Sequence, residues 1–513
     1  MMTGTIINTT IGKLRGRKEG GVYSFRGIPY GGPTGGKNRF KPPTRPEPWT
    51  GIKDATRYGP SCWQAIENHT TITILGAEGV DSMSEDCLVL NVWTSGFNDN
   101  GKRPVMVWLH GGGFVNGSGN HIPAIDGTNL ARTGEVVIVT VNHRLGVFGY
   151  LHLEELAGEE YAGSGNAGML DLIAALEWVR DNIEAFGGDP GNVMIFGESG
   201  GGSKVSYLMA MPGAEGLFHK AIIQSGPGLR AQTVEYATNS ARNLLDMVGL
   251  NSARVHVLHQ MRANTIYSAW LKMAQGSFIP GGDYFTPLVD GRTMPVQPFD
   301  PVAAPTVSKI PLIIGTTKDE MTFMMMRDPA FGKYDEETMR QRIVDNFNRR
   351  RGGNLSPDNV DEMIAGYRRI RPKATPHDIL IAVTTDQMRM SSILLAERKI
   401  ACGTAPVFMY LFTWESPAMQ GMLKATHTLE IPFAFNNIDP PVDILGNSPE
   451  RFQLALRMSN AWIAFAKNGD PNHGGIPQWP NYSSEDRSTM IFDKDCRIEN
   501  DPFPDERKLW ISK

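Results

Sequence analysis

The sequence predicts an α/β fold with a mostly parallel central sheet covered by helices on both faces. Three observations support this prediction: short apolar runs that recur along the chain, helical patterns between them, and a Gly- and Pro-rich first hundred residues. Short apolar runs are typical of strands buried on both faces, and strands that alternate with helices favour a parallel sheet.

The elements follow in order along the chain. Short alternating stretches at residues 23–25 and 88–93 indicate small edge strands and loops. Buried strands are then predicted at residues 105–109, 136–141, 193–196, 221–223, 310–314 and 407–412. Apolar residues spaced by three and four predict helices over 169–183 and 454–465, and the second should end at the Asn-Gly-Asp-Pro turn of residues 468–471.

Nothing in the sequence divides the 513 residues, because there is no low-complexity linker and no internal repeat. We therefore expect one large domain over 1–513. A polar, Arg-rich stretch around 327–371 interrupts the core pattern and predicts a helical insertion. A solvated surface is the favoured interpretation of this insertion, with a lid over the active site as the alternative.

The bulk composition excludes several classes of function. A net charge of −4, with 41% hydrophobic and 20% charged residues, describes an ordinary globular protein without a basic patch for nucleic acid. No apolar run approaches the roughly 18–20 residues that cross a bilayer, so we expect no membrane span. The four cysteines show no C-x-x-C spacing, and we expect no metal and no cofactor.

The N-terminal residues lack a charged segment followed by an apolar one. We therefore expect a cytoplasmic protein if the chain is complete, and a secreted or periplasmic one if a signal has been removed. The oligomeric state is left open.

Residues 197–201 read Gly-Glu-Ser-Gly-Gly and stand between a predicted strand and a stretch with helical periodicity. Glycines let the two backbones approach at such a turn, and the serine hydroxyl then projects above the sheet. Ser199 is therefore the candidate nucleophile. A serine hydroxyl is a poor nucleophile near neutral pH, so it needs a base, a group that orients the base, and donors for the developing oxyanion.

Residues 110–114, His-Gly-Gly-Gly-Phe, follow a predicted strand and can supply these donors. Consecutive residues without a Cβ leave their N–H groups free to converge on an oxyanion. We predict that Gly112 and Gly113 donate, with the Gly200 amide as the third donor. For this stretch by itself, a simple glycine-rich turn is the alternative.

Two carboxylates compete for the role of the acid. Asp319 and Glu320 follow the strand predicted at 310–314. Because neighbouring side chains of an extended backbone point to opposite sides, only one of them can face the base. The residues alone do not decide between the two.

Doubly wound hydrolases order their catalytic residues as nucleophile, acid and histidine, which restricts the base to positions after the acid. Three histidines remain: His377, His427 and His473. His377 lies in the polar insertion and His473 in a Gly/Asn/Pro turn, so both are expected at the surface. His427 lies in a loop after the predicted strand 407–412, and apolar residues that could hold it follow.

Several long motifs in this order resemble the type B carboxylesterase family, which includes bacterial para-nitrobenzyl esterases and the cholinesterases. Residues 186–201 match its nucleophile signature and residues 84–92 its second signature. Further matches lie at residues 141–146, 224–226 and 462–466. The resemblance covers nearly the full length and implies the α/β-hydrolase fold, with small N-terminal antiparallel strands and helical insertions.

The resemblance also assigns residues that spacing left open. The family's acid motif aligns with residues 319–321 and makes Glu320 the acid, while its His-x-x-Glu-[Ile/Leu]-Pro-Phe motif aligns with His427. It further implies a disulfide between Cys62 and Cys87, which conflicts with a reducing cytoplasm.

Five residues form the candidate substrate pocket: Phe114, Glu198, Phe278, Phe285 and Met321. The two phenylalanines near residue 280 are implied, by resemblance, to belong to the acyl pocket. Glu198 flanks the nucleophile and is expected in a buried polar network or against the substrate. Met321 opens a Met-rich run that forms either a soft pocket or, as the favoured interpretation, a core stripe.

The chain departs from the family's pattern at four positions. Gly200 stands where alanine is usual, Met321 replaces a glycine, and His143 stands where tyrosine is usual. Ala77 occupies the position of the choline-stacking tryptophan of cholinesterases. Recognition of a quaternary ammonium by cation–π contact is therefore disfavoured.

These residues together predict a serine carboxylesterase that hydrolyses uncharged esters through an acyl-enzyme, with an ester and water as its small-molecule partners. A carbamate or amide hydrolase with the same triad is the alternative. A non-catalytic, adhesion-type member of the family is disfavoured by the intact Ser, Glu and His set. Activity should rise with pH through an apparent pKa of about 6 to 7 as the histidine loses its proton.

Overall fold

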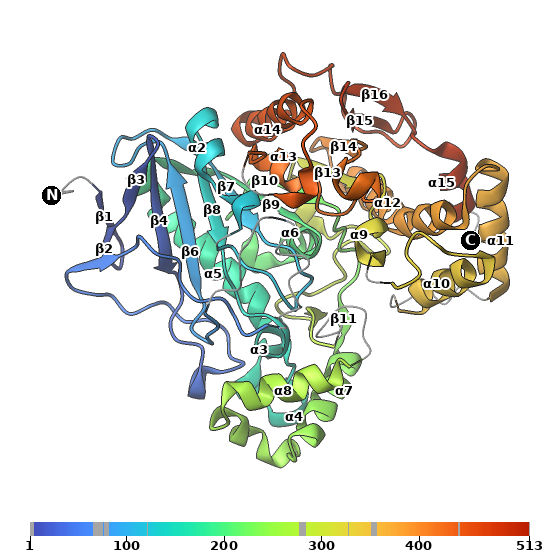
Figure 1. Cartoon of the computed structure of the whole chain (residues 1–513). Helices are drawn as coiled ribbons and strands as arrows, with labels where there is room; N and C mark the ends of the chain where they lie inside the picture. Colours follow the sequence, from blue (N-terminus) through green and yellow to red (C-terminus); the bar gives the residue numbers. More distant parts are fainter. Residues whose placement is uncertain are drawn as a thin grey trace.

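A twisted sheet of eleven strands runs through the molecule, in the order β16-β15-β14-β13-β10-β9-β7-β8-β6-β4-β3 (Figure 1). The computed structural model describes residues 5–64, 75, 82–120, 122–275, 284–326, 328–349, 357–439 and 442–511. In chain order, the strands of this sheet are β3 (Arg17–Glu19), β4 (Val22–Pro29), β6 (Val89–Thr94), β7 (Arg103–Leu109), β8 (Val137–Val141), β9 (Gly188–Glu198), β10 (Lys220–Gln224), β13 (Leu312–Thr317), β14 (Val407–Phe412), β15 (Ser488–Phe492) and β16 (Arg497–Asn500).

The sheet is parallel at its centre and antiparallel at both edges. All neighbours from β15 to β8 pair in parallel, whereas β8–β6, β6–β4, β4–β3 and β15–β16 pair antiparallel. Two small sheets accompany it, one of β1 (Ile6–Thr9), β2 (Gly12–Arg15) and β5 (Ile52–Asp54), the other of β11 (Gln232–Thr233) and β12 (Leu288–Val289). The predicted α/β fold, with its mostly parallel sheet and small N-terminal antiparallel strands, is confirmed.

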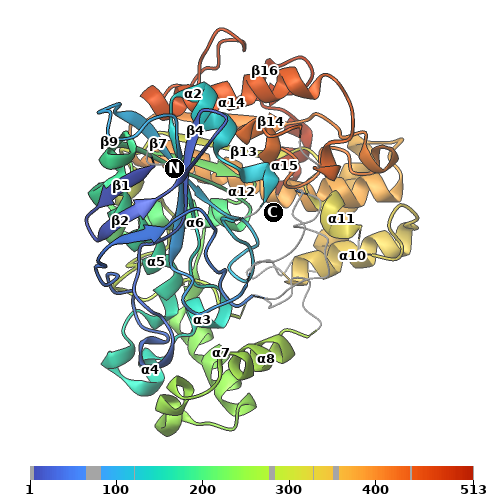
Figure 2. The same ribbon diagram turned by 60° about the vertical axis from the view of Figure 1, so that its left-hand side comes forward.

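Helices cover both faces of the sheet (Figures 1 and 2). They are α2 (Thr128–Gly134), α3 (Gly146–Tyr150), α4 (Glu154–Ala157), α5 (Ala167–Asn182), α6 (Gly200–Ala210), α7 (Val234–Met247), α8 (Ala263–Met273), α9 (Met321–Met325), α10 (Glu336–Arg349), α11 (Pro357–Ile370), α12 (Pro376–Cys402), α13 (Ile431–Phe435), α14 (Arg451–Asn468) and α15 (Pro504–Ile511). The helix predicted over 454–465 is α14, and it ends at Gly469 with a left-handed φ of 80°, as its Asn-Gly-Asp-Pro turn indicates.

Alternate residues of each central strand enter different cores. In β7, Val105, Val107 and Leu109 pack into the cluster that includes α5. Met106 and Trp108 pack on the other side, into the cluster that includes α14. Because both faces are covered, the strand reads as a continuous apolar run and not as an alternating one.

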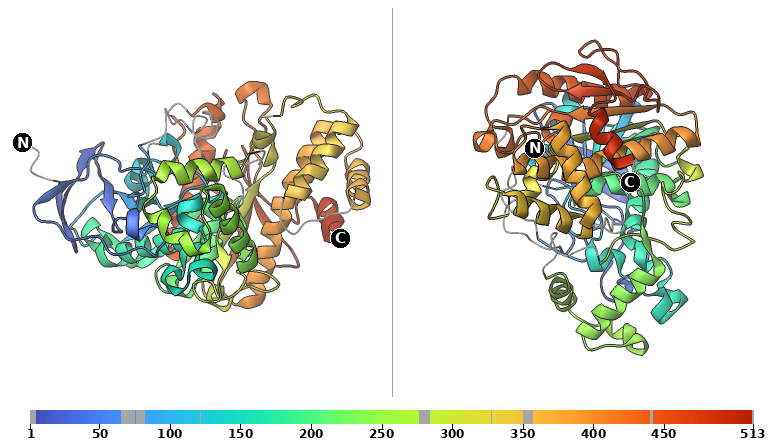
Figure 3. Two further views of the ribbon diagram at one scale, coloured as in Figure 1. Left: turned by 90° about the horizontal axis from the view of Figure 1, so that it is seen from below. Right: turned by 90° about the vertical axis from the view of Figure 1, so that its right-hand side faces the viewer.

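A third core cluster joins α9 with α10, α11 and α12. Figure 3 shows α10 and α11 packed beside α12 at one end of the molecule, with α15 against them. The helices α10 and α11 occupy the Arg-rich stretch around 327–371. The division of the chain into domains stays a prediction.

Helix α12 is the one described helix that is long and apolar enough to cross a bilayer. However, 67% of its apolar window is buried inside the protein. A core helix meets the same criteria of length and composition, so α12 is weak evidence for a membrane span.

Candidate active site

The candidate nucleophile sits where β9 turns into α6. Ser199 has φ 56° and ψ −123°, a conformation that side chains other than glycine rarely adopt. Glycines on both sides make the turn possible. A Cβ at Gly197 would lie 2.6 Å from the Leu109 carbonyl oxygen, and one at Gly201 would lie 2.0 Å from the same atom. The strand and the helix therefore meet at a distance that only glycine allows.

The loop after β14 brings His427 onto Glu320. The His427 Nδ1 lies 2.5 Å from Glu320 Oε2, and both side chains are buried. The Thr317 backbone N–H donates to the other carboxylate oxygen, Oε1, at 2.8 Å. The backbone N–H of His427 donates to the Glu320 carbonyl at 3.3 Å. These bonds orient the carboxylate and, through it, the imidazole.

The competing candidates lie elsewhere. Asp319 turns to the opposite side, as expected for a neighbour of Glu320, and its carboxylate accepts from the Ala425 N–H at 3.2 Å. His377 stacks on Tyr334 with ring centroids 5.6 Å apart. His473 Nε2 donates to the Arg457 carbonyl at 3.0 Å.

The second nitrogen of His427 faces the residue before the nucleophile. Nε2 lies 3.2 Å from Glu198 Oε1. Among the described residues, no hydrogen bond joins His427 to the Ser199 hydroxyl. A small movement of the imidazole from Glu198 towards the neighbouring serine is therefore needed for proton transfer. Catalytic hydrogen bonds are often long in the free enzyme and tighten when substrate binds.

Three buried carboxylates surround this one imidazole. Burial lowers the pKa of His427, but the charges of Glu198 and Glu320 outweigh burial and raise it to about 9. Burial raises the pKa of Glu198 to about 8. A proton on Glu198 removes one of the charges that act on His427, so the two groups titrate as a pair. If His427 is the catalytic base, activity is therefore expected to rise at a pH above the 6 to 7 of an ordinary histidine.

Glu430 is the third carboxylate, and the sequence reasoning missed it. Burial and the charge of Glu320 raise its pKa to about 7. The Gln224 amide donates to Glu430 Oε1 at 3.4 Å, and the Trp462 indole N–H donates to Gln224 Oε1 at 3.1 Å. The signal was present in the sequence, because Glu430 is the glutamate of the His-x-x-Glu motif that begins at His427.

The glycine loop after β7 lies against the start of α6. Gly112 and Gly113 have φ of 84° and 63°, in the left-handed region. A Cβ at Gly112 would lie 2.0 Å from Asn116 Oδ1. A Cβ at Gly200 would lie 2.4 Å from the Gly113 nitrogen, so the predicted donors from the two segments are brought together.

The candidate pocket residues are mostly buried. Phe114 packs between Tyr150 and Tyr207, with ring centroids 5.4 and 5.7 Å away. Phe285 belongs to the same core cluster as Phe114, and Met321 belongs to the cluster around α10 and α12. Phe278 lies outside the described residues, as does Ala77.

The structure does not contain the disulfide that the resemblance implied between Cys62 and Cys87. Cys62 and Cys87 are both free thiols and both buried. They lie in hydrogen-bonding contact, and this contact, together with burial, raises the pKa of Cys87 well above its usual value. The Leu145 N–H donates to Cys62 Sγ at 3.2 Å. The two sulfurs therefore lie side by side as buried thiols.

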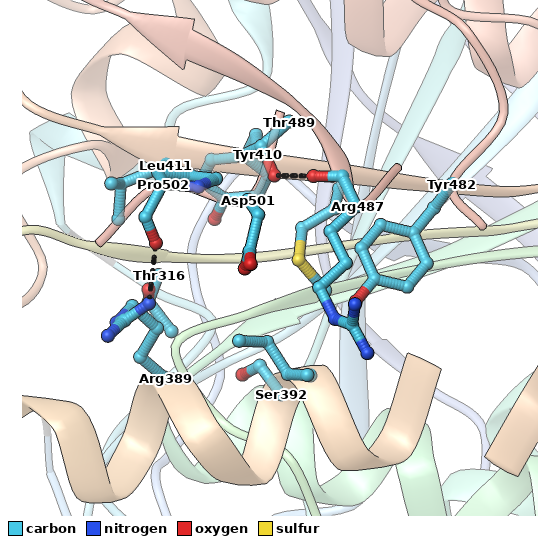
Figure 4. A pocket seen from close by; sticks show the side chains of 13 residues that line it. Thr316, Arg389, Ser392, Tyr410, Leu411, Tyr482, Arg487, Thr489, Asp501 and Pro502 are labelled. Atoms are coloured by element: carbon cyan, nitrogen blue, oxygen red, sulfur yellow. Dashed lines mark hydrogen bonds between the residues drawn. The ribbon is translucent and has the colours of Figure 1, made fainter. Parts of the chain in front are cut away.

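A separate small cavity lies between α12 and the strands β13, β14 and β15 (Figure 4). Its lining includes Thr316, Ser392, Tyr482 and Arg487. A volume of about 20 Å³ holds one water molecule. None of the candidate catalytic or oxyanion residues lines it, so this cavity is distinct from the site around Ser199.

Among the described residues, no group of three His, Cys, Asp or Glu side chains is arranged to hold a metal ion. The arrangement around Ser199 provides a hydroxyl, an imidazole oriented by a carboxylate, and glycine amides from two segments in close contact. Such a set performs acyl transfer.

The chain matches the model of the carboxylesterase family over residues 3–510. It is 38% identical to the para-nitrobenzyl esterase of Bacillus subtilis (strain 168) over the full length of both chains. It is 35% identical to the phenmedipham hydrolase of Pseudarthrobacter oxydans, covering 96% of this chain and 95% of that protein. A carboxylesterase structure from Geobacillus stearothermophilus superposes with a TM-score of 0.84 at 36% identity, covering 99% of this chain and 100% of that one.

Proposed function

Because this chain belongs to the carboxylesterase family and is a carboxylic ester hydrolase, we propose that Ser199, His427 and Glu320 perform its reaction. The substrates are uncharged carboxylic esters, and the reaction passes through an acyl-enzyme on Ser199. One observation carries the assignment: the Glu320 carboxylate lies 2.5 Å from the Nδ1 of an imidazole buried beside the strained serine.

In the first half-reaction the Ser199 hydroxyl attacks the ester carbonyl while His427 Nε2 accepts its proton. The Glu320 carboxylate keeps the proton of the imidazole on Nδ1 and stabilises the imidazolium that forms. The amides of Gly112, Gly113 and Gly200 donate to the oxyanion. His427 then returns the proton to the departing alcohol. A water molecule repeats these steps on the acyl-enzyme and releases the acid.

The test compares the wild-type protein with Ser199→Ala. Because the hydroxyl is the attacking group, turnover of a p-nitrophenyl ester should fall by about 10³-fold or more. An organophosphate should label the wild-type protein at Ser199 and leave the variant unlabelled. Near-normal turnover by the variant would remove Ser199 from the mechanism.

The bond that is cleaved is tested with matched substrates. A p-nitrobenzyl ester is a suitable probe, because a relative with 38% identity carries the name of that esterase activity. The corresponding carbamate keeps the leaving group of the ester, and the corresponding amide keeps its acyl group. Each therefore differs from the ester mainly in the bond that is cleaved. We expect the ester to have the highest kcat/KM, and a higher value for the carbamate or the amide would reassign the substrate class.

A further inference from the structure

A lysine is buried directly behind the glycine loop of residues 110–114, called the oxyanion loop below. Lys204 lies on α6, one turn after Gly200, and is fully buried. Its Nζ donates to the His110 carbonyl at 2.8 Å and lies 5.5 Å from the centre of the Phe114 ring. Among the described residues, no carboxylate forms an ion pair with it. A buried ammonium without a counterion is unfavourable, so its presence calls for a partner.

The two contacts of Lys204 lie at the two ends of the oxyanion loop. His110 and Phe114 stand immediately before and after Gly111, Gly112 and Gly113. The loop rests on the first turn of α6, because a Cβ at Gly200 would lie 2.2 Å from the Gly113 carbonyl oxygen. The ammonium therefore lies against the backbone that carries the proposed oxyanion donors.

The neighbouring titratable groups do not supply this positive charge. His110 stacks on His143 with ring centroids 4.9 Å apart, and the Nδ1 of each ring lies 2.9 and 2.8 Å from the carbonyls of Gly111 and Arg144. Burial, with a further contribution from the charge of Lys204, lowers the pKa of both histidines well below the usual value. The two rings are therefore neutral.

The guanidinium of Arg144, the residue after His143, is neutralised. It pairs with Asp171, with Nη2 2.6 Å from Oδ1. Among the described residues, Lys204 is thus a positive group behind the loop without an ion-pair partner.

On the basis of the proposed function, we propose that Lys204 is a positioning residue for ester hydrolysis, whose ammonium fixes the oxyanion loop through the His110 carbonyl and finds its counter-charge in the oxyanion. An ester carbonyl carries only a partial charge, whereas the tetrahedral intermediate carries a full one. The interaction is therefore stronger in the transition state than in the bound substrate, which is the condition for an effect on kcat. Burial lowers the pKa of Lys204 to about 7, and a nearby oxyanion would favour its charged form.

The test uses Lys204→Met, which keeps the length and apolar stem of the side chain and removes the charge. We expect kcat for a p-nitrophenyl ester to fall by about 10- to 100-fold, with KM changed by less than about threefold. The affinity for a phenylboronic acid, which forms an anionic tetrahedral adduct with a serine, should fall by a similar factor. The melting temperature should stay equal or rise, because a buried unpaired charge is removed.

Lys399 offers a matched control. It is also fully buried, and its Nζ also donates to one backbone carbonyl, that of Ser308 at 3.2 Å. It lies on α12 and has no contact with the oxyanion loop. Lys399→Met should therefore leave kcat and the boronate affinity unchanged.

Two further variants separate charge from shape. Lys204→Arg, which keeps a positive charge, should retain more of kcat and of the boronate affinity than Lys204→Met does. Lys204→Gln, which can donate a hydrogen bond but carries no charge, should lose as much of kcat and of the boronate affinity as Lys204→Met does. If Lys204→Met does not fold, these two variants decide the question through the same measurements.

The inference is overturned if Lys204→Met has wild-type kcat and boronate affinity. It is equally overturned if Lys399→Met loses the same activity, because the effect then reflects buried lysines in general. Failure of the proposed function is distinguished by the wild-type protein alone, which would then not be labelled by an organophosphate.

Discussion

Glu198 should set the pH at which the esterase becomes active. Its Oε1 lies 3.2 Å from His427 Nε2, and both side chains are almost completely buried. At an effective dielectric constant of about 20, a full charge at this distance interacts with the imidazolium by about 5 kcal/mol, or about four pKa units. This value is a ceiling, because burial raises the pKa of Glu198 itself to about 8 and leaves it partly protonated.

Replacing Glu198 with Gln should therefore lower the pKa of His427 by about one to two units from its raised value of about 9. The direction follows from the role of the base. His427 must be neutral to accept a proton, so a raised pKa moves the rise of kcat/KM to higher pH, and removal of the negative charge moves it back to lower pH.

The assay is kcat/KM for a p-nitrophenyl ester between pH 5 and 9.5, with uncatalysed hydrolysis subtracted. The wild-type midpoint should lie above 6.5, and the midpoint of Glu198→Gln should lie about one to two units lower. Glu215→Gln, at an exposed position, controls for the change in net charge. Identical midpoints for the wild-type protein and Glu198→Gln would refute the electrostatic coupling.

Three further predictions concern other parts of the molecule. Glu320→Gln should lower kcat by about 10³- to 10⁴-fold, because an amide no longer fixes the tautomer of His427; steady-state kinetics tests this, and a loss below tenfold would contradict the role of Glu320. Asp171→Asn should lower the free energy of unfolding by about 3–5 kcal/mol, because it leaves the buried guanidinium of Arg144 unpaired; a loss under about 1 kcal/mol in urea denaturation would show that the pair is dispensable. Because all four cysteines are free in the structure, the denatured protein should titrate four thiols per chain without reductant, whereas a count of two would indicate a disulfide.

The pattern of apolar residues along the chain was sufficient to predict the central strands of the sheet. Strands such as β7 and β14 are buried on both faces, so almost every position is apolar and the run is visible without knowledge of the neighbours. Boundaries were less accurate. β9 starts at Gly188, five residues before the apolar run at 193–196, because its first half is a polar extension that the run does not reveal.

The acid illustrates where local reasoning stops. Asp319 and Glu320 are adjacent carboxylates that follow the same strand, so spacing gave no preference. The choice depends on which side chain reaches the imidazole of His427, about a hundred residues later. Glu320 meets the imidazole, while Asp319 meets the Ala425 backbone on the other side.

The chain by itself determined the chemistry of single positions: a serine that only glycine neighbours can hold in a strained turn, and a glycine run with no Cβ to cover its amides. These properties depend on covalent geometry and are readable wherever the residues occur. Only the tertiary structure decided the electrostatics, because charge interactions depend on distance and burial and not on separation along the chain. The three carboxylates around His427, the two free thiols in contact with each other and the buried Lys204 behind the glycine loop all follow from how distant segments pack.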